Sequence, residues 1–435
     1  MPLQYAERRI TKMSKTNASP CVLLVCLLCA SLGWLSSAHA AGTWVATWAA
    51  APQQPVDPVT TGTPYDTPPQ SFSDQTIRQT VRLSTGGRAL RLRLTNEYGI
   101  TPTTLDAVRV GLSDGNGGVL AGTNRVITFN GGSKIVTLSQ AAPAISDPVE
   151  MTVPELGSLA VSIHVPKGGN PGYATPHTLG QQTTYVVSGD QTGEAALRGA
   201  STGTVRYFLS GVDVLKRQRA LTIVTIGDSI TDGYGSTVDT NHRWPDLFAE
   251  RLQKSKLLEK FGVANQGISG NRVLTDGFGP NALSRFDRDV LACPGVGFVV
   301  MLVGINDLGI PTVFPKSGAM PSADSIIAGY RQMITRAQAR GVRVIGATLM
   351  PYQGAMDGKY YSEQGEAERE AINAFIRNSN AFDGVIDFDA AVRDHANPLR
   401  FDPVYDSGDH LHPNDAGYEA MAAAIDLRLF QAFRK

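Results

Sequence analysis

From Ala220 onward, short apolar runs alternate with longer amphipathic runs, and this alternation limits the fold more than any other feature of the chain. Runs of strand length followed by runs of helix length predict a parallel sheet with helices on both faces. Residues 218–435 are therefore predicted to form a three-layer α/β domain. We expect strands at Leu221–Ile226, Gly262–Ala264, Gly297–Val303, Val342–Thr348 and Val385–Phe388, and helices at Trp244–Lys254, Ala282–Leu291, Ser325–Arg340, Glu363–Asn378 and Asp415–Phe433.

The preceding residues 41–217 show a different pattern, in which short strand-like runs are separated by Asn, Gly, Pro and Asp. Between residues 90 and 94 leucine alternates with arginine, which is typical of a strand with one buried face. Ser84–Gly87 separates this strand from Thr76–Leu83 and predicts a hairpin turn. The spacing of these runs predicts a jelly-roll-like β-sandwich. Further strands are expected at Val108–Leu112, Val126–Phe129, Ile135–Leu138, Leu159–Val165 and Thr183–Val187.

Ser229 lies where the first strand of the α/β part stops, directly after Gly227 and Asp228. Open α/β sheets bind ligands at the carboxyl ends of their strands. A serine hydroxyl becomes a nucleophile when an imidazole takes its proton and a carboxylate orients that imidazole. Asp409 and His412, near the C-terminus, can fill these two roles. The alternative is that both segments are ordinary loops and helix caps, with Asn414 capping the last helix.

Two further segments follow predicted strands and carry small or amide residues. One is Asn265–Asn271 and the other is Gly304–Asp307. Both are expected at the same sheet edge as Ser229, where a backbone N–H or an asparagine amide could donate a hydrogen bond to an oxyanion.

Taken together, these four segments resemble the signature blocks of the SGNH (or GDSL) hydrolases, which hold a Ser, a Gly, an Asn and a His in that order. In this resemblance Ser229 corresponds to the nucleophile. Gly270 corresponds to the backbone oxyanion donor and Asn306 to the side-chain donor. Asp409 and His412 correspond to the Asp-x-x-His block. The resemblance implies ester hydrolysis through an acyl-enzyme, with no cofactor.

The resemblance covers about residues 220–433 and implies a flavodoxin-like arrangement of the three layers. Its glycine is ambiguous, because Gly267 and Gly270 both lie in the second block; Gly270 is preferred because it follows a small polar residue. Asn271 and Arg272 lie beside this glycine and are candidate substrate contacts. The alternative for both is packing or ion pairing within the protein.

The segments 279–287 and 304–309 look like the secreted, acetylxylan-esterase-like branch of this family, which implies short acyl esters of carbohydrates. One alternative keeps the chemistry but makes the protein a lipase, lysophospholipase or arylesterase, although no lid-like apolar helix is evident. A second alternative is a catalytically inactive glycan-binding protein. Beside a secreted esterase, the β-sandwich could also be a carbohydrate-binding module in which Trp44, Trp48 or Tyr98 stacks on sugars. The alternative is that these aromatic residues belong to the core or to a domain interface.

The charge balance and the absence of several motifs argue against other classes of function. Lys plus Arg and Asp plus Glu number 39 each among the 435 residues, so no basic excess indicates nucleic-acid binding. His410 and His412 form a close pair, but no HExxH motif accompanies them, and no metal site is predicted. The chain also lacks a Gly-x-Ser-x-Gly elbow and a Gly-x-Gly-x-x-Gly loop after the first strand, which argues against an ordinary α/β-hydrolase and against dinucleotide binding.

Residues 1–40 are interpreted as a secretory signal peptide. Basic residues between positions 8 and 15 precede the apolar run Cys21–Leu35, and Ala38–Ala40 provides a small-residue cleavage site. The protein is therefore expected to be secreted or periplasmic, without stable membrane insertion after cleavage following Ala40. The alternatives are a retained membrane anchor or a lipoprotein. Removal of this segment leaves Cys293 as the sole cysteine and excludes an intrachain disulfide.

Overall fold

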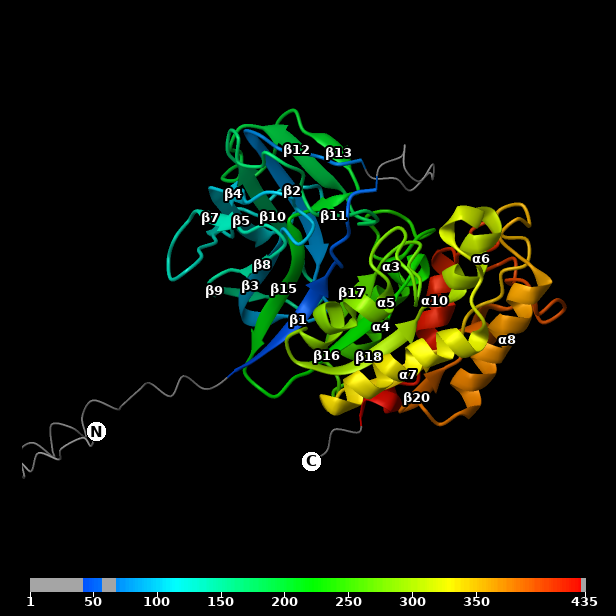
Figure 1. Ribbon diagram of the computed structural model, residues 1–435. Coiled ribbons are helices and arrows are strands. Elements are labelled where there is room, and N and C mark those ends of the chain that lie inside the picture. The colour runs from blue at the N-terminus through cyan, green and yellow to red at the C-terminus, as the bar shows by residue number, and fades with distance from the viewer. Residues whose placement is uncertain (1–41, 57–67, 432–435) are drawn as a thin grey trace, which may run out of the picture. The chain divides into compact units, whose positions relative to one another are not determined.

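The parallel sheet predicted after Ala220 is present in the computed structural model, which describes residues 42–56 and 68–431 (Figure 1). Within these residues it has five strands, all parallel, in the order β17-β16-β18-β19-β20. β16 is buried at every position, as expected for a strand covered on both faces. The strands are β16 (Thr222–Gly227), β17 (Gly262–Gly267), β18 (Val296–Leu302), β19 (Arg343–Ala347) and β20 (Gly384–Ile386).

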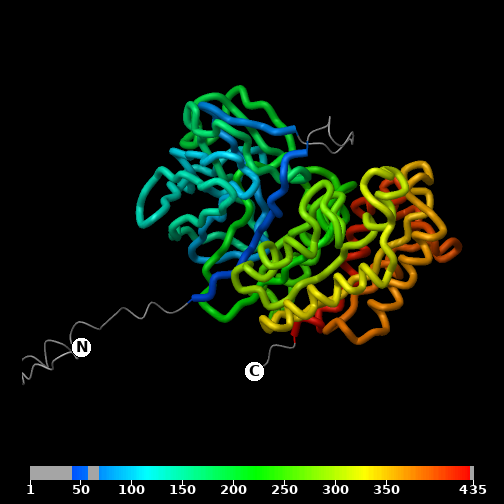
Figure 2. Tube along the Cα trace, in the orientation of Figure 1, coloured from blue at the N-terminus to red at the C-terminus, as the bar shows by residue number. Residues whose placement is uncertain are grey.

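The helices of this part pack in two groups. In one group α7 contacts α8 and α5, and in the other α10 contacts α4 and α9; Figure 2 shows α7 in yellow beside α8 in orange. The helices are α3 (Ser229–Asp232), α4 (Trp244–Gln253), α5 (Ala282–Phe286), α6 (Ile305–Val313), α7 (Ala323–Ala339), α8 (Glu363–Asn378), α9 (Phe388–Val392) and α10 (Asp415–Ala424), with a π-helical turn η1 (Asp287–Leu291) and 3₁₀ turns η2 (Pro315–Ser317) and η3 (Leu427–Phe430). The predicted α/β fold is confirmed.

The last helix is shorter than predicted. α10 ends at Ala424, because Ile425 adopts an extended conformation. The side chain of Asp426 then accepts a hydrogen bond from the backbone N–H of Arg428 and starts the separate turn η3. Aspartate is a strong helix-capping residue, and here it begins a new turn inside a run whose apolar spacing alone indicated one helix.

The N-terminal part consists of antiparallel sheets. One has the path β1-β15-β3-β8, with β9 also paired to β3, and another has the order β13-β12-β2-β10-β5-β6. Buried apolar side chains from both sheets form one core, as predicted for a β-sandwich. The strands are β1 (Thr43–Ala49), β2 (Gln75–Arg82), β3 (Gly87–Thr95), β4 (Thr103–Leu105), β5 (Ala107–Leu112), β6 (Arg125–Val126), β7 (Val136–Leu138), β8 (Pro143–Ile145), β9 (Val149–Val153), β10 (Ser158–Val165), β11 (Pro176–His177), β12 (Thr184–Ser188), β13 (Ser201–Gly203), β14 (Arg206–Tyr207) and β15 (Leu209–Lys216).

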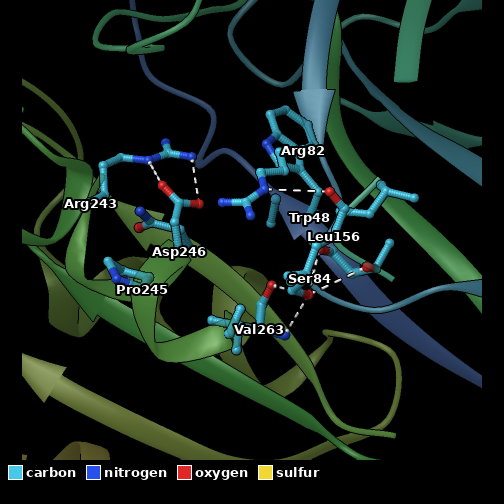
Figure 3. A pocket seen from close by; sticks show the side chains of 13 residues that line it. Trp48, Arg82, Ser84, Leu156, Arg243, Pro245, Asp246 and Val263 are labelled. Atoms are coloured by element: carbon cyan, nitrogen blue, oxygen red, sulfur yellow. Dashed lines mark hydrogen bonds and ion pairs between the residues drawn. The ribbon is translucent and has the colours of Figure 1, made fainter. Parts of the chain in front are cut away.

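The predicted hairpin at Ser84–Gly87 is wrong, because β2 and β3 belong to different sheets. The Ser84 hydroxyl donates to the carbonyl oxygen of Thr47 at 2.7 Å and accepts from the backbone N–H of Val263 at 2.8 Å (Figure 3). These bonds hold the crossing between the sheets against β1 and β17. The pocket beside Ser84 contains about 20 Å³, room for roughly one water molecule, and is a packing gap.

β1 contributes to both cores. Val45 and Trp48 belong to the apolar cluster of the β part, whereas Ala46 and Ala49 belong to that of the α/β part. The backbone N–H of Ala46 also donates to the hydroxyl of Thr222 at 3.0 Å. The described residues after position 41 form one compact unit. The predicted boundary after residue 217 falls between β15 and β16, and the division into two domains stays a prediction.

Each aromatic residue considered for sugar stacking lies against an arginine. This contact supports the interpretation as core or interface residues. The pairs are Trp44 with Arg91, Trp48 with Arg206 and Tyr98 with Arg288, with 4.6, 5.2 and 5.6 Å between guanidinium carbon and ring centroid.

The predicted signal peptide lies outside the described residues. Within the described ranges, none of the helices has the length and apolar character needed to cross a membrane.

Candidate active site

Ser229 begins α3, and only Asp228 separates it from the end of β16. The carboxylate of Asp228 caps this helix by accepting from the backbone N–H of Ile230 at 3.1 Å. A side chain at Gly227 would approach the Thr231 hydroxyl to 2.2 Å, so the tight exit from the strand requires glycine. Burial raises the pKa of Asp228 to about 7. The strand end therefore presents the serine at the sheet edge where the sequence predicted it.

Ser229, His412 and Asp409 form a continuous hydrogen-bonded chain. The Ser229 Oγ lies 2.8 Å from His412 Nε2, although 183 positions separate the two residues in the sequence. His412 Nδ1 lies 2.6 Å from an oxygen of Asp409. The other carboxylate oxygen of Asp409 accepts from the backbone N–H of His412 at 2.9 Å. Asn414 caps α10, as the helix-cap alternative predicted. The segment that holds His412 and Asn414 therefore provides both a helix cap and the contact with Ser229.

The charge state of Asp409 follows from these contacts. Burial opposes its ionisation, but the hydrogen bonds and charge of His412 and the backbone N–H of Leu411 hold its pKa well below the usual range. Asp409 is therefore a carboxylate at neutral pH and can stabilise a positive charge on the imidazole.

Tyr234 packs against the imidazole of His412, with ring centroids 4.4 Å apart. Neither a motif nor a spacing in the sequence pointed to this contact.

His410, the other member of the histidine pair, is turned to a different carboxylate, with its Nδ1 2.5 Å from Asp406. Across the part of the chain that the structure describes, no cluster of three His, Cys, Asp or Glu side chains could hold a metal ion.

The two glycines of the second block have different environments. Gly270 lines the same pocket as Ser229 and adopts a φ of +73°, and a Cβ there would lie 2.3 Å from the ring of Phe278. Gly267 ends β17 and packs against the backbone of Asp232, away from the pocket. Of the two, Gly270 is therefore the glycine whose backbone borders the space above Ser229.

Asn306 lies in the first turn of α6 and is oriented from both ends. Its Oδ1 accepts from the hydroxyl of Tyr360 at 2.6 Å, and its Nδ2 donates to the carbonyl oxygen of Asn271 at 3.2 Å. The neighbouring Asp307 accepts from the backbone N–H of Val273 at 2.7 Å, which joins α6 to the loop after β17. Burial raises the pKa of Asp307 to about 6. Tyr360 and Asp307 were not predicted.

The side chain of Asn271 is occupied within the protein. Its Nδ2 donates to the carbonyl oxygen of Pro280 at 2.8 Å, and its Oδ1 accepts from Arg285 at 2.9 Å. Arg272 donates to the carbonyl oxygens of Asp276 and Ser317. Neither residue lines the pocket of Ser229, and Arg272 borders the adjoining cavity. The geometry favours the packing alternative for Asn271.

Arg285, in α5, is fully buried and joins the ends of two strands. No sequence motif indicated this role. Its guanidinium donates to the carbonyl oxygen of Gln266 in β17 at 2.7 Å and to that of Gly227 in β16 at 3.1 Å. Asp289 balances its charge at 3.1 Å. Because Asn271 binds the same guanidinium, the Arg285 side chain contacts both the strand before Ser229 and the loop after β17 that bonds to Asn306.

The space above Ser229 is small. It measures about 50 Å³, roughly a third of a cavity that takes benzene in another protein. Phe278, Ile310 and Phe314 line both this space and an adjoining cavity of about 600 Å³. The pocket is lined by Ser229, Tyr234, Ser269, Gly270, Phe278, Asn306, Ile310, Phe314, Met356, Tyr360, Leu411 and His412.

Several solved structures are similar to this chain over about half its length. A GDSL-like lipase from Bacteroides thetaiotaomicron is 21% identical, with a TM-score of 0.36, over 49% of this chain and 89% of its own. An acetyl xylan esterase is 22% identical, with a TM-score of 0.36, over 47% and 97%. A carbohydrate acetylesterase from Sinorhizobium meliloti is 14% identical, with a TM-score of 0.39, over 49% and 100%. A comparison with curated proteins gives no match.

Residues 225–420 match the family model described as the GDSL-like Lipase/Acylhydrolase family. The matched span contains the strand end at Ser229, the loop at Gly270, Asn306 and the segment that holds Asp409 and His412. The match covers less than half of the chain and indicates that this segment is a GDSL-like esterase or acylhydrolase.

Proposed function

We propose that this protein is an exported serine esterase that removes short acyl groups, chiefly acetyl, from carbohydrates. The observation that carries the proposal is the hydrogen-bonded chain from the Ser229 hydroxyl through His412 to Asp409. In this arrangement His412 Nε2 takes the proton of Ser229 as Oγ attacks the ester carbonyl carbon. The imidazolium that forms is stabilised by the Asp409 carboxylate.

The tetrahedral oxyanion would be held by three donors: the backbone N–H groups of Ser229 and Gly270 and the Nδ2 of Asn306. Ser229 is in the first turn of α3, where backbone N–H groups have no partner within the helix. Asn306 Nδ2 carries two hydrogens and gives one of them to Asn271, so the other can reach a substrate oxygen. Collapse of the intermediate expels the alcohol, which takes the proton from His412. Water then repeats the sequence on the acyl-enzyme.

The size of the pocket supports a short acyl group. The space of about 50 Å³ above Ser229 suits one or two carbons beyond the carbonyl, whereas the adjoining cavity of about 600 Å³ suits a larger alcohol such as a sugar. A long-chain or aryl ester is a second candidate. Its supporting observation is the apolar wall of the larger cavity, formed by residues such as Ile310 and Val313.

Chain-length preference separates the two candidates. We expect kcat/KM on p-nitrophenyl esters to fall from acetyl to butyryl to octanoyl, with release of acetate from acetylated xylan. A lipase would show the opposite trend, because each methylene buried in an apolar trough contributes about 0.8 kcal/mol. Rising activity with chain length and no acetate release would exclude the carbohydrate proposal. Failure to hydrolyse any ester would favour the inactive glycan-binding alternative.

A pair of variants tests the role of the pocket wall. Phe314→Ala removes a side chain that lines both cavities and should raise octanoyl activity relative to acetyl activity. Phe375→Ala is the matched control, because Phe375 lies on α8 under Arg331 and borders neither cavity. An unchanged ratio in the Phe314 variant would show that the wall does not limit the acyl chain.

Export is the second element of the proposal and depends on the predicted signal peptide. N-terminal sequencing of protein recovered from outside the cytoplasm should begin at Ala41. A first residue before Cys21, or recovery only with membranes, would instead support a retained anchor.

A further inference from the structure

A histidine of the β part is bonded to the helix that carries Ser229. His177, in β11, places Nε2 3.0 Å from a carboxylate oxygen of Asp232, the last residue of α3. Its Nδ1 lies 3.0 Å from the carbonyl oxygen of Ala51. Both members of the pair are buried, at 5% and 1% exposure. Because a carbonyl oxygen only accepts, Nδ1 carries a proton, and Nε2 and Asp232 share another between them.

Asp232 also bonds to the loop that holds Ser269 and Gly270, here called the oxyanion loop. Its second carboxylate oxygen accepts from the backbone N–H of Ser269 at 3.0 Å and from the Ser269 hydroxyl at 3.2 Å. Ser269 directly precedes Gly270, whose backbone borders the space above Ser229. The chain of bonds from His177 therefore ends one residue from a proposed oxyanion donor.

The residues after His177 are also linked to Phe278, in the wall of the same pocket. The Gln53 side chain accepts from the backbone N–H of Thr178 at 2.9 Å and donates to the carbonyl oxygen of Phe278 at 2.9 Å. Phe278 lies over Gly270 and lines the pocket. Gln181, in the same loop, donates to the carbonyl oxygen of Gly233, the C-cap of α3, at 2.8 Å.

We infer that His177 is a positioning residue of the esterase site: through Asp232 it fixes Ser269 and Gly270 so that the Gly270 N–H faces the developing oxyanion. The inference rests on the proposed function. Oxyanion donors act because they are already aligned when charge develops, and a displacement of about 1 Å can lower the rate about a hundredfold. The β part thereby supplies part of the active-site framework, in addition to covering the α/β part.

His164 offers a matched control within the same β part. It is also buried and pairs with a carboxylate, with its Nδ1 2.6 Å from Asp106. It lies in β10, and its pair with Asp106 has no bond to α3 or to the oxyanion loop. Loss of His164 should therefore report the effect of removing a buried histidine pair without the connection to Gly270.

The experiment measures kcat and KM on p-nitrophenyl acetate, with the folded fraction determined by near-ultraviolet circular dichroism. His177→Ala should lower kcat about tenfold to a hundredfold and leave KM within about twofold, since the lost alignment acts on the transition state. His177→Gln retains a donor and should recover part of kcat. His164→Ala should keep the kcat of the wild type for its folded fraction.

A double-mutant cycle tests whether His177 acts through Asp232. Asp232→Ala combined with His177→Ala should lower kcat no further than Asp232→Ala alone, because both variants break one chain of bonds. Additive losses would overturn the inference. So would wild-type kcat in a folded His177 variant, a change confined to KM, or an equal loss in His164→Ala.

If His177→Ala does not fold, His177→Phe is compared with His177→Gln, because phenylalanine keeps the volume of the side chain but has no donor. Equal kcat in these two variants would overturn the inference.

Ser229→Ala, assayed in parallel, separates this inference from the proposed function. Surviving activity in that variant would overturn the proposed function itself. Abolished activity there, together with wild-type kcat in the His177 variants, would overturn only the role of His177.

Discussion

At the scale of single residues, Asn306 shows how neighbours determine what a side chain can do. The Tyr360 hydroxyl occupies its oxygen and the carbonyl oxygen of Asn271 takes one of its hydrogens, so the amide cannot rotate without losing both bonds. The sequence predicted Asn306 from its position after a strand. It could not reveal Tyr360, 54 positions away, because nothing in a tyrosine between two loops indicates which acceptor it will meet.

Replacement of Asn306 by alanine tests its proposed role as an oxyanion donor. Asn306→Ala should lower kcat about a hundredfold to a thousandfold with little change in KM, because the lost hydrogen bond strengthens only in the transition state. Steady-state kinetics on p-nitrophenyl acetate check this, with Tyr360→Phe expected to give a smaller loss. An effect confined to KM would make Asn306 a substrate-binding residue.

At the scale of secondary-structure elements, the site forms where β16, β17 and β18 end at one sheet edge. Buried apolar runs and caps were sufficient to predict these strands and most helices, because both signals are local. The pairing of strands was less predictable. Residues 84–87 have the composition of a hairpin, yet they cross between sheets, because alternation shows that a strand has a buried face without showing which strand lies beside it.

Arg285 carries an element-scale prediction, since it bonds to the ends of β16 and β17 together. Arg285→Met leaves two buried carbonyl oxygens and Asp289 with fewer partners and should lower the free energy of unfolding by about 3–5 kcal/mol. Denaturant titration measures this change. Arg428→Ala, which removes an exposed pair with Asp426, should leave the midpoint almost unchanged. Equal effects of the two variants would show that Arg285 does not hold the strand ends.

At the scale of the whole molecule, the spacing of apolar runs predicted two patterns of structure, and both are present. The sequence did not indicate how the two parts meet, because β1 reads as an ordinary apolar strand. In the structure, side chains of β1 pack partly in the core of the β part and partly in that of the α/β part. His177, in the β part, also bonds to Asp232 of α3. Such contacts join residues far apart in the sequence and leave no periodic signal.

This shared strand predicts cooperative unfolding. Separation of the two parts would expose Ala46 and Ala49 on one face of β1 and break the bond from Ala46 to Thr222, so neither part should unfold first. Scanning calorimetry of the protein that begins at Ala41 should show a single transition, with agreement between calorimetric and van't Hoff enthalpies. Two separate transitions would show that the parts are energetically independent.

The central claim is that Ser229 attacks the ester as the nucleophile activated by His412. The most direct test is the turnover of Ser229→Ala on p-nitrophenyl acetate, beside wild-type protein of equal folded content. Because the members of such a triad act as a unit, turnover should fall by about three orders of magnitude or more. Retention of near wild-type turnover in the folded variant would contradict the assignment.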